Sequence, residues 1–556
     1  MRIKFFILFL VLLSGFIHPQ AEYVQYNHPV YSFLQRMDAL KIISNYNSLE
    51  FPKTRKTIAS YLREVIAAKE DLTGVDRKML DDYCSEFELE IFGTQERTTS
   101  LIGSTDYSFF SPKEKYFYSL VDTSRFTIFV NVIGNLESII NQDLDKKTTK
   151  SGAFARWGGT LRGTILNKFG YYMRGTNGKF WGERSIAGQI NELKFNYKFN
   201  ADPRAVTATD YFDNTEGYLT LDYDLVRFKL GREQKQIGYG HYKTILDVNT
   251  PQFDYFSFDI DYKAFNFSYF HGKLLGRSSV QGDSIQGIIN SVDSKYIGYH
   301  RLGVKFSDHF ALGAGEIIIY ANRPVDFSYL NPFNFYKGTE HANQDRDNSM
   351  LFFDFSNNSF RGLRLSGSVL IDDIDFGKIG TGWYGNQLAY NLNFYSANFY
   401  PIIPLELQFQ YIRVEPYVYT HRIYNNNYSN LGYSLVSPVL PNSEIFYLGL
   451  SYHPTYRLGL NLDFTYSVHG ANELNSNGTI KRNVGGDPNI GMRAFDEPIV
   501  HFLDGVHEYF RSITFSAVFE PVKNYFISGE LTYGNNDLQN SHGKYLAAYA
   551  LINLRI

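Results

Sequence analysis

The chain has 556 residues, of which 17% are aromatic, and it carries a net charge of −3 with a single cysteine, Cys84. So small a charge gives no electrostatic case for a nucleic-acid partner, and one cysteine excludes an internal disulfide. The length alone would allow about two to four soluble domains. The many Tyr (44), Phe (47) and Gly (45) residues instead favour a strand-rich protein with glycine turns.

The first 21 residues have the pattern of a secretory signal peptide. Arg2 and Lys4 form a basic start, residues 5–17 are apolar, and cleavage is expected after Ala21. Beyond them no run of 18 apolar residues follows, and the mean hydropathy is −0.27. This excludes a protein that crosses a membrane with helices. A membrane β-barrel stays open, because alternating strands average out as polar.

Residues 27–92 have the apolar spacing of helices. Pro52 and Thr54 mark the expected start of a helix, in which Ile58, Leu62 and Val65 recur at helical intervals. Residues 28–40 and 74–92 continue the pattern. The segment therefore predicts a small helical bundle on the periplasmic side, and the sequence does not identify a partner for it.

From Arg125 to Ile556 the apolar period changes to two. In residues 458–467, Leu460, Leu462 and Phe464 share one face, and the other face is polar. Residues 192–199 and 363–372 alternate in the same way. The alternation fails only in residues 177–224, where one of 19 candidate strands is expected to be wrong. That leaves about 18 strands, or 20 if one is missed, since bacterial barrels have even numbers.

Two features favour a membrane barrel over a soluble sandwich. The strands are about 9–12 residues long, which suits tilted membrane strands. Short turns also alternate with long connections, as they do in outer-membrane barrels. We therefore expect a transmembrane antiparallel β-barrel over residues 125–556, placed in the lipid of a Gram-negative outer membrane. Its long connections are expected at 135–154, 232–253, 274–296, 321–348, 373–385, 417–443, 470–508 and 535–544.

The connection 321–348 contains a dense polar cluster, GTEHANQDRDN. A metal site needs converging ligands, but Glu340 and His341 are adjacent, so they need not point the same way, and no second His follows four residues on. A catalytic site needs a nucleophile with a base, and neither is visible. The chain also has no G-x-S-x-G, P-loop or paired-cysteine motif. The sequence therefore predicts no enzyme activity, metal or cofactor.

Several blocks resemble the Wzi capsule-assembly family. Residues 29–44 and 51–62 are similar to its periplasmic helical segment. LVRFKLGREQ (225–234), NPFNFY with RDNSMLFFDF (331–355) and LSGSVLIDDID (365–375) are similar to blocks of its barrel, in the same order. The resemblance implies a closed 18-stranded outer-membrane barrel that acts as a lectin for capsular polysaccharide, without catalysis. The terminal Ile556 departs from the Phe that usually ends such barrels.

Sugars are bound by aromatic faces together with carboxylates, amides and arginines. Two predicted loop tips offer such groups, and the 345–347 cluster either meets the polysaccharide or holds its loop over the lumen. An aromatic girdle at the membrane interface would explain the tryptophans equally well. A porin-like channel for sugars or other solutes is the alternative function. The candidate polysaccharide-binding residues are Trp181, Glu183, Arg184, Asp345, Arg346, Asp347, Trp383 and Tyr384.

Overall fold

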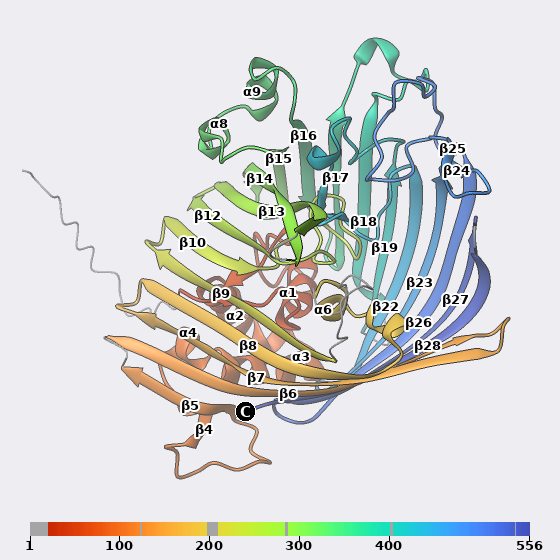
Figure 1. Cartoon of the computed structure of the whole chain (residues 1–556). Helices are drawn as coiled ribbons and strands as arrows, with labels where there is room; N and C mark the ends of the chain where they lie inside the picture. The colour runs from red at the N-terminus through yellow and green to blue at the C-terminus, as the bar shows by residue number, and fades with distance from the viewer. Residues whose placement is uncertain (1–20, 123–124, 197–209, 284–286, 401–403, 540) are drawn as a thin grey trace, which may run out of the picture.

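The computed structural model describes residues 21–556 except 123–124, 197–209, 284–286, 401–403 and 540. The expected signal peptide, apart from Ala21, lies outside the described residues. Eighteen antiparallel strands form one closed barrel in which β28 pairs back onto β6 (Figure 1). The strands of this ring are β6 (Phe126–Asp143), β7 (Thr148–Ile165), β8 (Phe169–Gly182), β9 (Tyr211–Asp222), β10 (Val226–Glu233), β12 (Phe253–Tyr262), β13 (Phe265–Asp283), β14 (Gly287–Ser307), β15 (Phe310–Ala321), β16 (Asn348–Asn357), β17 (Leu363–Asp373), β18 (Gln387–Tyr400), β19 (Leu405–Val414), β22 (Ser443–Thr455), β23 (Leu458–Ala471), β26 (Val506–Val522), β27 (Tyr525–Leu538) and β28 (Ser541–Arg555).

Helices precede the ring and short elements decorate it. The helices are α1 (Val30–Ala39), α2 (Arg55–Ala67), α3 (Gly74–Glu86), α4 (Glu88–Phe92), α5 (Arg184–Ala187), α6 (Asn191–Lys194), α8 (Phe327–Leu330) and α9 (Tyr336–Ala342). Strands β4 (Thr98–Ile102) and β5 (Glu114–Asp122) extend the sheet beside β6. Minor pairs are β1 (Tyr23–Val24) with β3 (Lys53–Thr54), β2 (Glu50–Phe51) with β11 (Gln236–Ile237), β20 (Ser429–Asn430) with β21 (Tyr433–Ser434), and β24 (Glu473–Leu474) with β25 (Ile480–Arg482).

The period of two sorts side chains to the two faces of the wall. On β23, Leu462 and Phe464 are 43% and 42% exposed on the outer face. Asp463 between them points inward, where the Tyr447 hydroxyl donates to its carboxylate at 2.6 Å. The pattern is that of a barrel with an apolar outside and a polar lumen. The predicted fold class and strand number are confirmed.

The predicted strand at residues 192–199 is wrong. Residues Asn191–Lys194 form helix α6, and Leu193 is fully buried in a cluster with the inward-facing Phe154 and Phe180. The alternation of this short stretch reflects a loop that packs one side into the lumen. Residues 197–199 lie outside the described residues.

Three expected long loops are instead extended hairpins. Residues 135–154, 274–296 and 535–544 continue the ladders of β6–β7, β13–β14 and β27–β28 almost to their tips, for example with Asp283 opposite Gly287. Their polar alternation continues beyond the apolar outer surface, which the sequence pattern does not distinguish from a loop. The other long connections and the short turns alternate around the ring as predicted.

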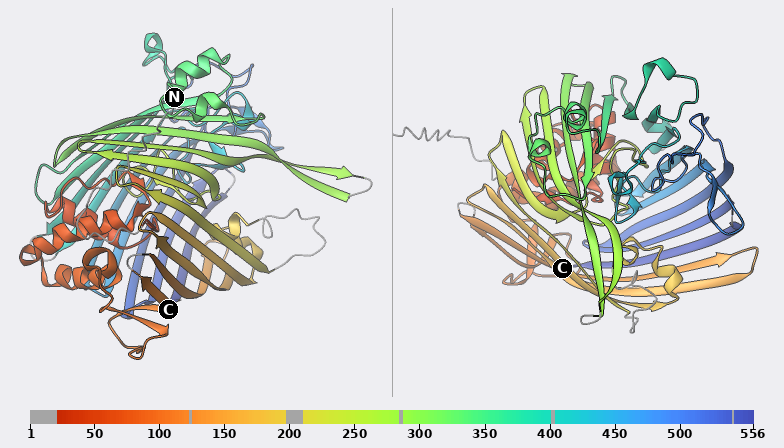
Figure 2. Two further views of the ribbon diagram at one scale, coloured as in Figure 1. Left: turned by 90° about the vertical axis from the view of Figure 1, so that its left-hand side faces the viewer. Right: turned by 45° about the horizontal axis from the view of Figure 1, so that its top comes forward.

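Helices α1 to α4 gather at the short-turn end of the barrel (Figure 2). The Thr54 and Thr73 side chains cap α2 and α3 by accepting from the N–H groups of Thr57 and Asp76. The turns themselves hold the bundle, as shown by the 3.1 Å bond from the Asn45 amide to Asp308. Across the described residues, no helix is long and apolar enough to cross a membrane.

Two long connections fold into the barrel. Tyr419 and Tyr428 of the connection 415–442 are fully buried, with ring centroids 5.6 Å apart. The Tyr419 hydroxyl donates to the Thr244 carbonyl of the other connection, 238–252, at 2.8 Å. Both connections pack against inward side chains of β12 to β19, so this side of the lumen is filled. The shared cluster includes Tyr239, Ile245, Phe270, Tyr299, Phe352, Ile412, Val418, Leu435 and Val436.

Acid should weaken the attachment of α3 to the barrel. Burial alone would raise the pKa of the Glu86 carboxyl, but His28 at 3.1 Å and Arg555 at 3.5 Å help to hold that pKa well below its ordinary value of about 4.5. A lowered pKa in the folded state means that the carboxylate stabilises the fold above about pH 4.5. This stabilisation is lost as the pH falls from there through the folded-state pKa.

The measurement is the thermal unfolding midpoint between pH 2 and pH 7. We expect the midpoint of the native protein to fall below about pH 4.5, and Glu86→Gln to remove part of that fall. Glu70→Gln is the matched control, because the Glu70 side chain is 93% exposed. Identical pH profiles for Glu86→Gln and the native protein would contradict the prediction.

Candidate binding site in the barrel lumen

The side of the lumen that the loops leave free contains a cavity of about 1330 Å³. Its wall is formed by inward residues of β6 to β9 and of β26 to β28, and residues 23–29 and helix α3 line the end nearest the short turns. The cavity exists because the two in-folded connections fill only the part of the barrel beside β12 to β19.

Aromatic rings form one surface of the cavity. The rings of Tyr172 on β8 and Tyr218 on β9 stack at 5.0 Å with 18° between their planes. Tyr218 is held from behind, since its hydroxyl donates to the Tyr23 carbonyl and accepts from the Tyr23 N–H. Tyr172 is the more accessible ring, and the Gln25 amide donates to its hydroxyl at 2.8 Å. A stacked pair with polar edges is a platform suited to the C–H face of a sugar.

The charges in the cavity wall balance. Seven Arg and Lys residues and seven Asp and Glu residues line it. Arg174 contacts Glu216 at 3.2 Å, and Arg156 contacts Glu137 at 2.5 Å. A wall whose cations are held by carboxylates keeps a fixed shape and exerts little net attraction on ions. Neutral hydrogen-bonding groups on the same wall, including Asn131, Asn135, Thr176, Asn177, Asn214 and Gln252, can donate to or accept from hydroxyls.

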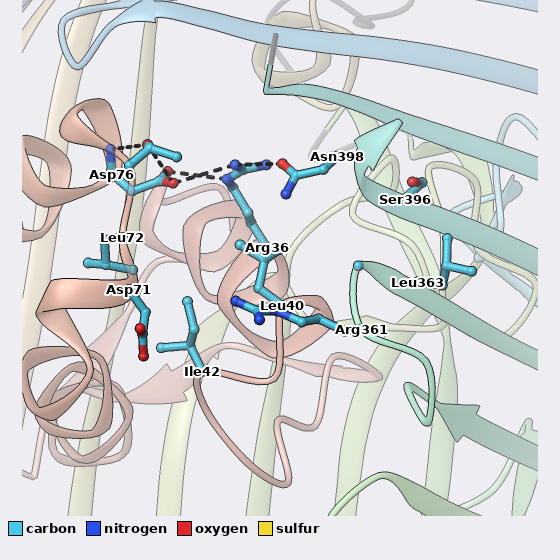
Figure 3. Close-up of a pocket in the computed structure, with 12 residues that line it drawn as sticks. Arg36, Leu40, Ile42, Asp71, Leu72, Asp76, Arg361, Leu363, Ser396 and Asn398 are labelled. Carbon is cyan, nitrogen blue, oxygen red and sulfur yellow. Dashed lines mark hydrogen bonds and ion pairs between the residues drawn. The ribbon is translucent and has the colours of Figure 1, made fainter. Parts of the chain in front are cut away.

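A second cavity, of about 330 Å³, lies at the short-turn end between the helices and the wall (Figure 3). Arg36 of α1 spans it, donating to Asp76 of α3 at 3.2 Å and to Asn398 of β18 at 3.1 Å. Arg36 also donates to the Ala397 carbonyl. Because these bonds join two helices to a barrel strand, the residues of this cavity fasten the bundle in place.

The residues predicted from sequence do not form one site. Trp181 lies near the end of β8, 45% exposed on the outer face, with the Lys179 ammonium 5.6 Å from its ring. Glu183 and Arg184 follow it at the start of α5, where Arg184 is 3.8 Å from Asp210. The outward direction of Trp181 is that of a girdle residue, away from the lumen cavity.

Trp383 and Tyr384 lie far from Trp181. They belong to the connection between β17 and β18, eight positions from β8 in the ring of eighteen. The Lys378 ammonium is 3.9 Å from the Trp383 ring, and the Tyr384 ring packs 5.7 Å from Tyr417. This pair therefore sits beside the in-folded connection 415–442, at the long-loop end.

The residues of the 345–347 cluster make contacts that hold their loop in place. The Asp347 carboxylate is buried and accepts from both terminal nitrogens of Arg323 at 2.7 Å and from the Tyr329 hydroxyl at 2.7 Å. The buried ion pair that fixes the loop is thus with Arg323, and the Arg346 carbonyl accepts from Asn426 at 2.6 Å. Asp345 is exposed and meets Arg422. Asp345 and Arg346 thus contact the in-folded connection 415–442, whereas α8 and α9 of the same loop pack against the outer wall.

Glu340, His341 and Asp345 do converge, contrary to the expectation from their spacing. Their ligand atoms lie within 4.8 Å of one another, because Glu340 and His341 end helix α9 and the chain turns back at Asp345. The Glu340 carboxylate is already engaged by Ser349 and by Lys337 at 3.2 Å. We assign no metal to this cluster.

Comparisons with known proteins identify the fold of this chain and nothing more specific. No family model matches the sequence, and no curated protein matches it. Among solved structures, Wzi from Escherichia coli superimposes with a TM-score of 0.56 over 96% of this chain and 99% of that one, at 11% identity. The fold is Wzi-like. Pseudomonas aeruginosa OccK8 (OprE) covers 77% of this chain and 98% of its own, with a TM-score of 0.45 and 12% identity.

Sequence reasoning missed the cavity residues. Tyr172 and Arg174 lie on β8, and Glu216 and Tyr218 lie on β9, within the residues 177–224 where the alternation fails. A sharper signal is present, because Tyr172 and Arg174 share one face of β8, and Glu216 and Tyr218 share one face of β9. What the pattern lacks is any indication of which part of the lumen the loops leave free.

Proposed function

We propose that this protein is an outer-membrane barrel that binds a surface polysaccharide and helps to assemble or retain it on the cell. The observation that carries the proposal is the lumen itself, which is partly filled by its own loops and otherwise holds a cavity lined by balanced charges, aromatic rings and amides. In the proposed outer-membrane location, helices α1 to α4 lie in the periplasm and the long connections face the outside of the cell.

The likeness to Wzi supports the proposal. Wzi from Escherichia coli is an outer-membrane protein involved in group 1 capsule assembly and a carbohydrate-binding β-barrel. At 11% identity the likeness supports the fold, and the choice of carbohydrate as ligand rests on the cavity wall. We further propose that binding occurs without catalysis, metal or cofactor, because the wall carboxylates described above are engaged by arginines.

Two parallel assays on the purified protein test the proposal. One measures binding of the surface polysaccharide of the native organism to the protein in detergent. The other measures conductance in planar lipid bilayers. We expect saturable binding together with little or no open-channel conductance. Absence of binding with steady conductance would contradict the proposal.

A porin-like channel for sugars or other solutes is the second candidate. One observation favours it, namely that a cavity of about 1330 Å³ remains in the lumen beside the part that the loops fill. A polar, charge-balanced passage would suit uncharged solutes. The conductance assay separates the two candidates, since a channel must carry current whether or not it binds polysaccharide.

A further inference from the structure

The faces of the barrel wall are fixed by contacts inside it. On β13 and β14, Ser268 and Tyr299 point into the lumen, because their hydroxyls donate to Glu50 of the N-terminal segment at 3.1 and 2.9 Å. Since side chains alternate along a strand, Tyr269 and His300 point outward.

The connection between β15 and β16, residues 322–347, carries α8 and α9 (Figure 1) and packs on these outward groups. The Tyr269 hydroxyl donates to the Leu330 carbonyl at 3.0 Å, and the ring of Tyr336 lies 4.4 Å from that of His300. Tyr329 and Tyr336 are fully buried against the outward Ile318 and Tyr320 of β15. The hairpin of α8 and α9 is therefore a second layer on the outside of the barrel.

This layer covers charges that the outer wall could not otherwise carry. His300 and Glu316 form a pair at 3.0 Å on the outer face, with side chains 14% and 5% exposed. The Tyr336 N–H donates to the Glu316 carboxylate at 2.8 Å. Polar and charged groups facing lipid are costly. The hairpin removes this pair from the surrounding medium, and its Tyr336 and Lys337 N–H groups donate to the Glu316 carboxylate.

Three phenylalanines are strongly exposed on the part of the hairpin that includes α8 and the start of α9. Phe327, Phe333 and Phe335 are 84%, 75% and 59% exposed. Phe333 stacks on the outward Phe267 of β13 at 5.3 Å, and Phe267 adjoins Leu302, which is 47% exposed on β14. The three phenylalanines thus continue the apolar outer surface of the barrel.

The hairpin also satisfies much of its own backbone. The Asp326 carboxylate accepts from the Ser328 N–H, and the Asn331 side chain accepts from the Phe333 N–H at 3.1 Å. The Asn334 amide donates to the Ser328 carbonyl at 2.7 Å. Internal bonding of this kind suits a segment at the boundary of a membrane, where few waters reach the backbone.

We propose that the α8–α9 hairpin is an interfacial anchor, with Phe327, Phe333 and Phe335 inserted among acyl chains of the outer lipid leaflet near the headgroup boundary. The inference rests on the proposed outer-membrane location and goes beyond polysaccharide binding. Exposed rings on a short helical segment are the usual means by which a protein lies on a bilayer surface. Here they would fix the depth and tilt of the barrel on the side of β13 to β16.

Cysteine labelling in phosphatidylcholine vesicles tests the anchor. Phe327→Cys and Phe335→Cys are each labelled with an environment-sensitive fluorophore, and quenching by acyl chains brominated at mid-chain is measured. Cys84 does not interfere, because it is 3% exposed and burial raises the pKa of its thiol to about 11. Phe515→Cys, 48% exposed on the outer face of β26, reports a site in contact with acyl chains. Phe495→Cys, 78% exposed in the connection 472–505, reports an exposed position in a long connection, away from the β-strands of the wall.

We expect quenching at positions 327 and 335 to reach at least half of that at position 515, and quenching at 495 to be absent. Quenching at 515 without quenching at 327 and 335 overturns the anchor and leaves the outer-membrane location intact, as water or a second copy of the chain would then cover the hairpin. No quenching at 515 overturns the location and the anchor together.

Discussion

Tyr172→Leu is expected to weaken polysaccharide binding about fivefold, because one stacking ring contributes about 1 kcal/mol. Leucine keeps the cavity apolar at this point and of similar volume, but it removes the flat face. Tyr172 is suited to this test since its ring is the more accessible of the two, whereas Tyr218 is buried and its hydroxyl bonds the Tyr23 backbone. The measurement is the dissociation constant for purified polysaccharide, by titration calorimetry in detergent.

Two matched variants separate the ring from other effects. Tyr172→Phe keeps the ring and loses only the hydroxyl that accepts from Gln25, so binding should stay within about twofold of the native protein. Tyr411→Leu removes a tyrosine that packs on the outer face of β19, 4.9 Å from Phe446, and should leave binding unchanged. If Tyr172→Phe is as weak as Tyr172→Leu, the stacking role of Tyr172 is wrong.

The double variant Tyr419→Ala with Tyr428→Ala is expected to open the barrel. Each change removes a fully buried ring, which costs about 3–5 kcal/mol in a packed core. The pair joins the connection 415–442 to the connection 238–252, and the Tyr428 hydroxyl donates to the Ile245 carbonyl at 2.5 Å. Loosening both connections should raise single-channel conductance in planar bilayers well above that of the native protein.

The barrel itself should survive this change, because its ladder does not depend on the two rings. Retention of the heat-modifiable gel mobility of a folded barrel would verify this. Tyr424→Ala is the control from the same connection, since that side chain is 44% exposed. Conductance that stays at the native level in a folded double variant would show that these connections are not what closes the lumen.

The barrel could be predicted from the sequence because the alternation of apolar and polar residues that produces it is visible within each strand. Each strand, such as β23, repeats one alternation of apolar and polar residues, and the wall has only two faces. The error at residues 192–196 has the same origin, since a loop that buries a residue such as Leu193 can alternate over a short stretch without forming a strand.

The binding residues depend on contacts that local pattern does not contain. Trp181 and Trp383 both looked like loop-tip aromatics, yet Trp181 points outward from β8, and Trp383 packs on Tyr384, whose ring lies against Tyr417 of the in-folded connection. Asp347 pairs with Arg323, which is 24 residues away in the sequence, because the α8–α9 hairpin folds back on the wall. Which part of the lumen stays free is decided by the packing of connections more than a hundred residues apart, as between Tyr419 and Thr244.

The most direct test of polysaccharide retention is made in the native organism. The gene is deleted, and cell-attached and released surface polysaccharide are measured in the deletion strain and in strains that regain the native chain or Tyr172→Leu. We predict that deletion moves polysaccharide from the cells to the medium at unchanged total, that the native chain restores it, and that Tyr172→Leu restores it only in part. An unchanged partition between cells and medium in the deletion strain would contradict the proposed function.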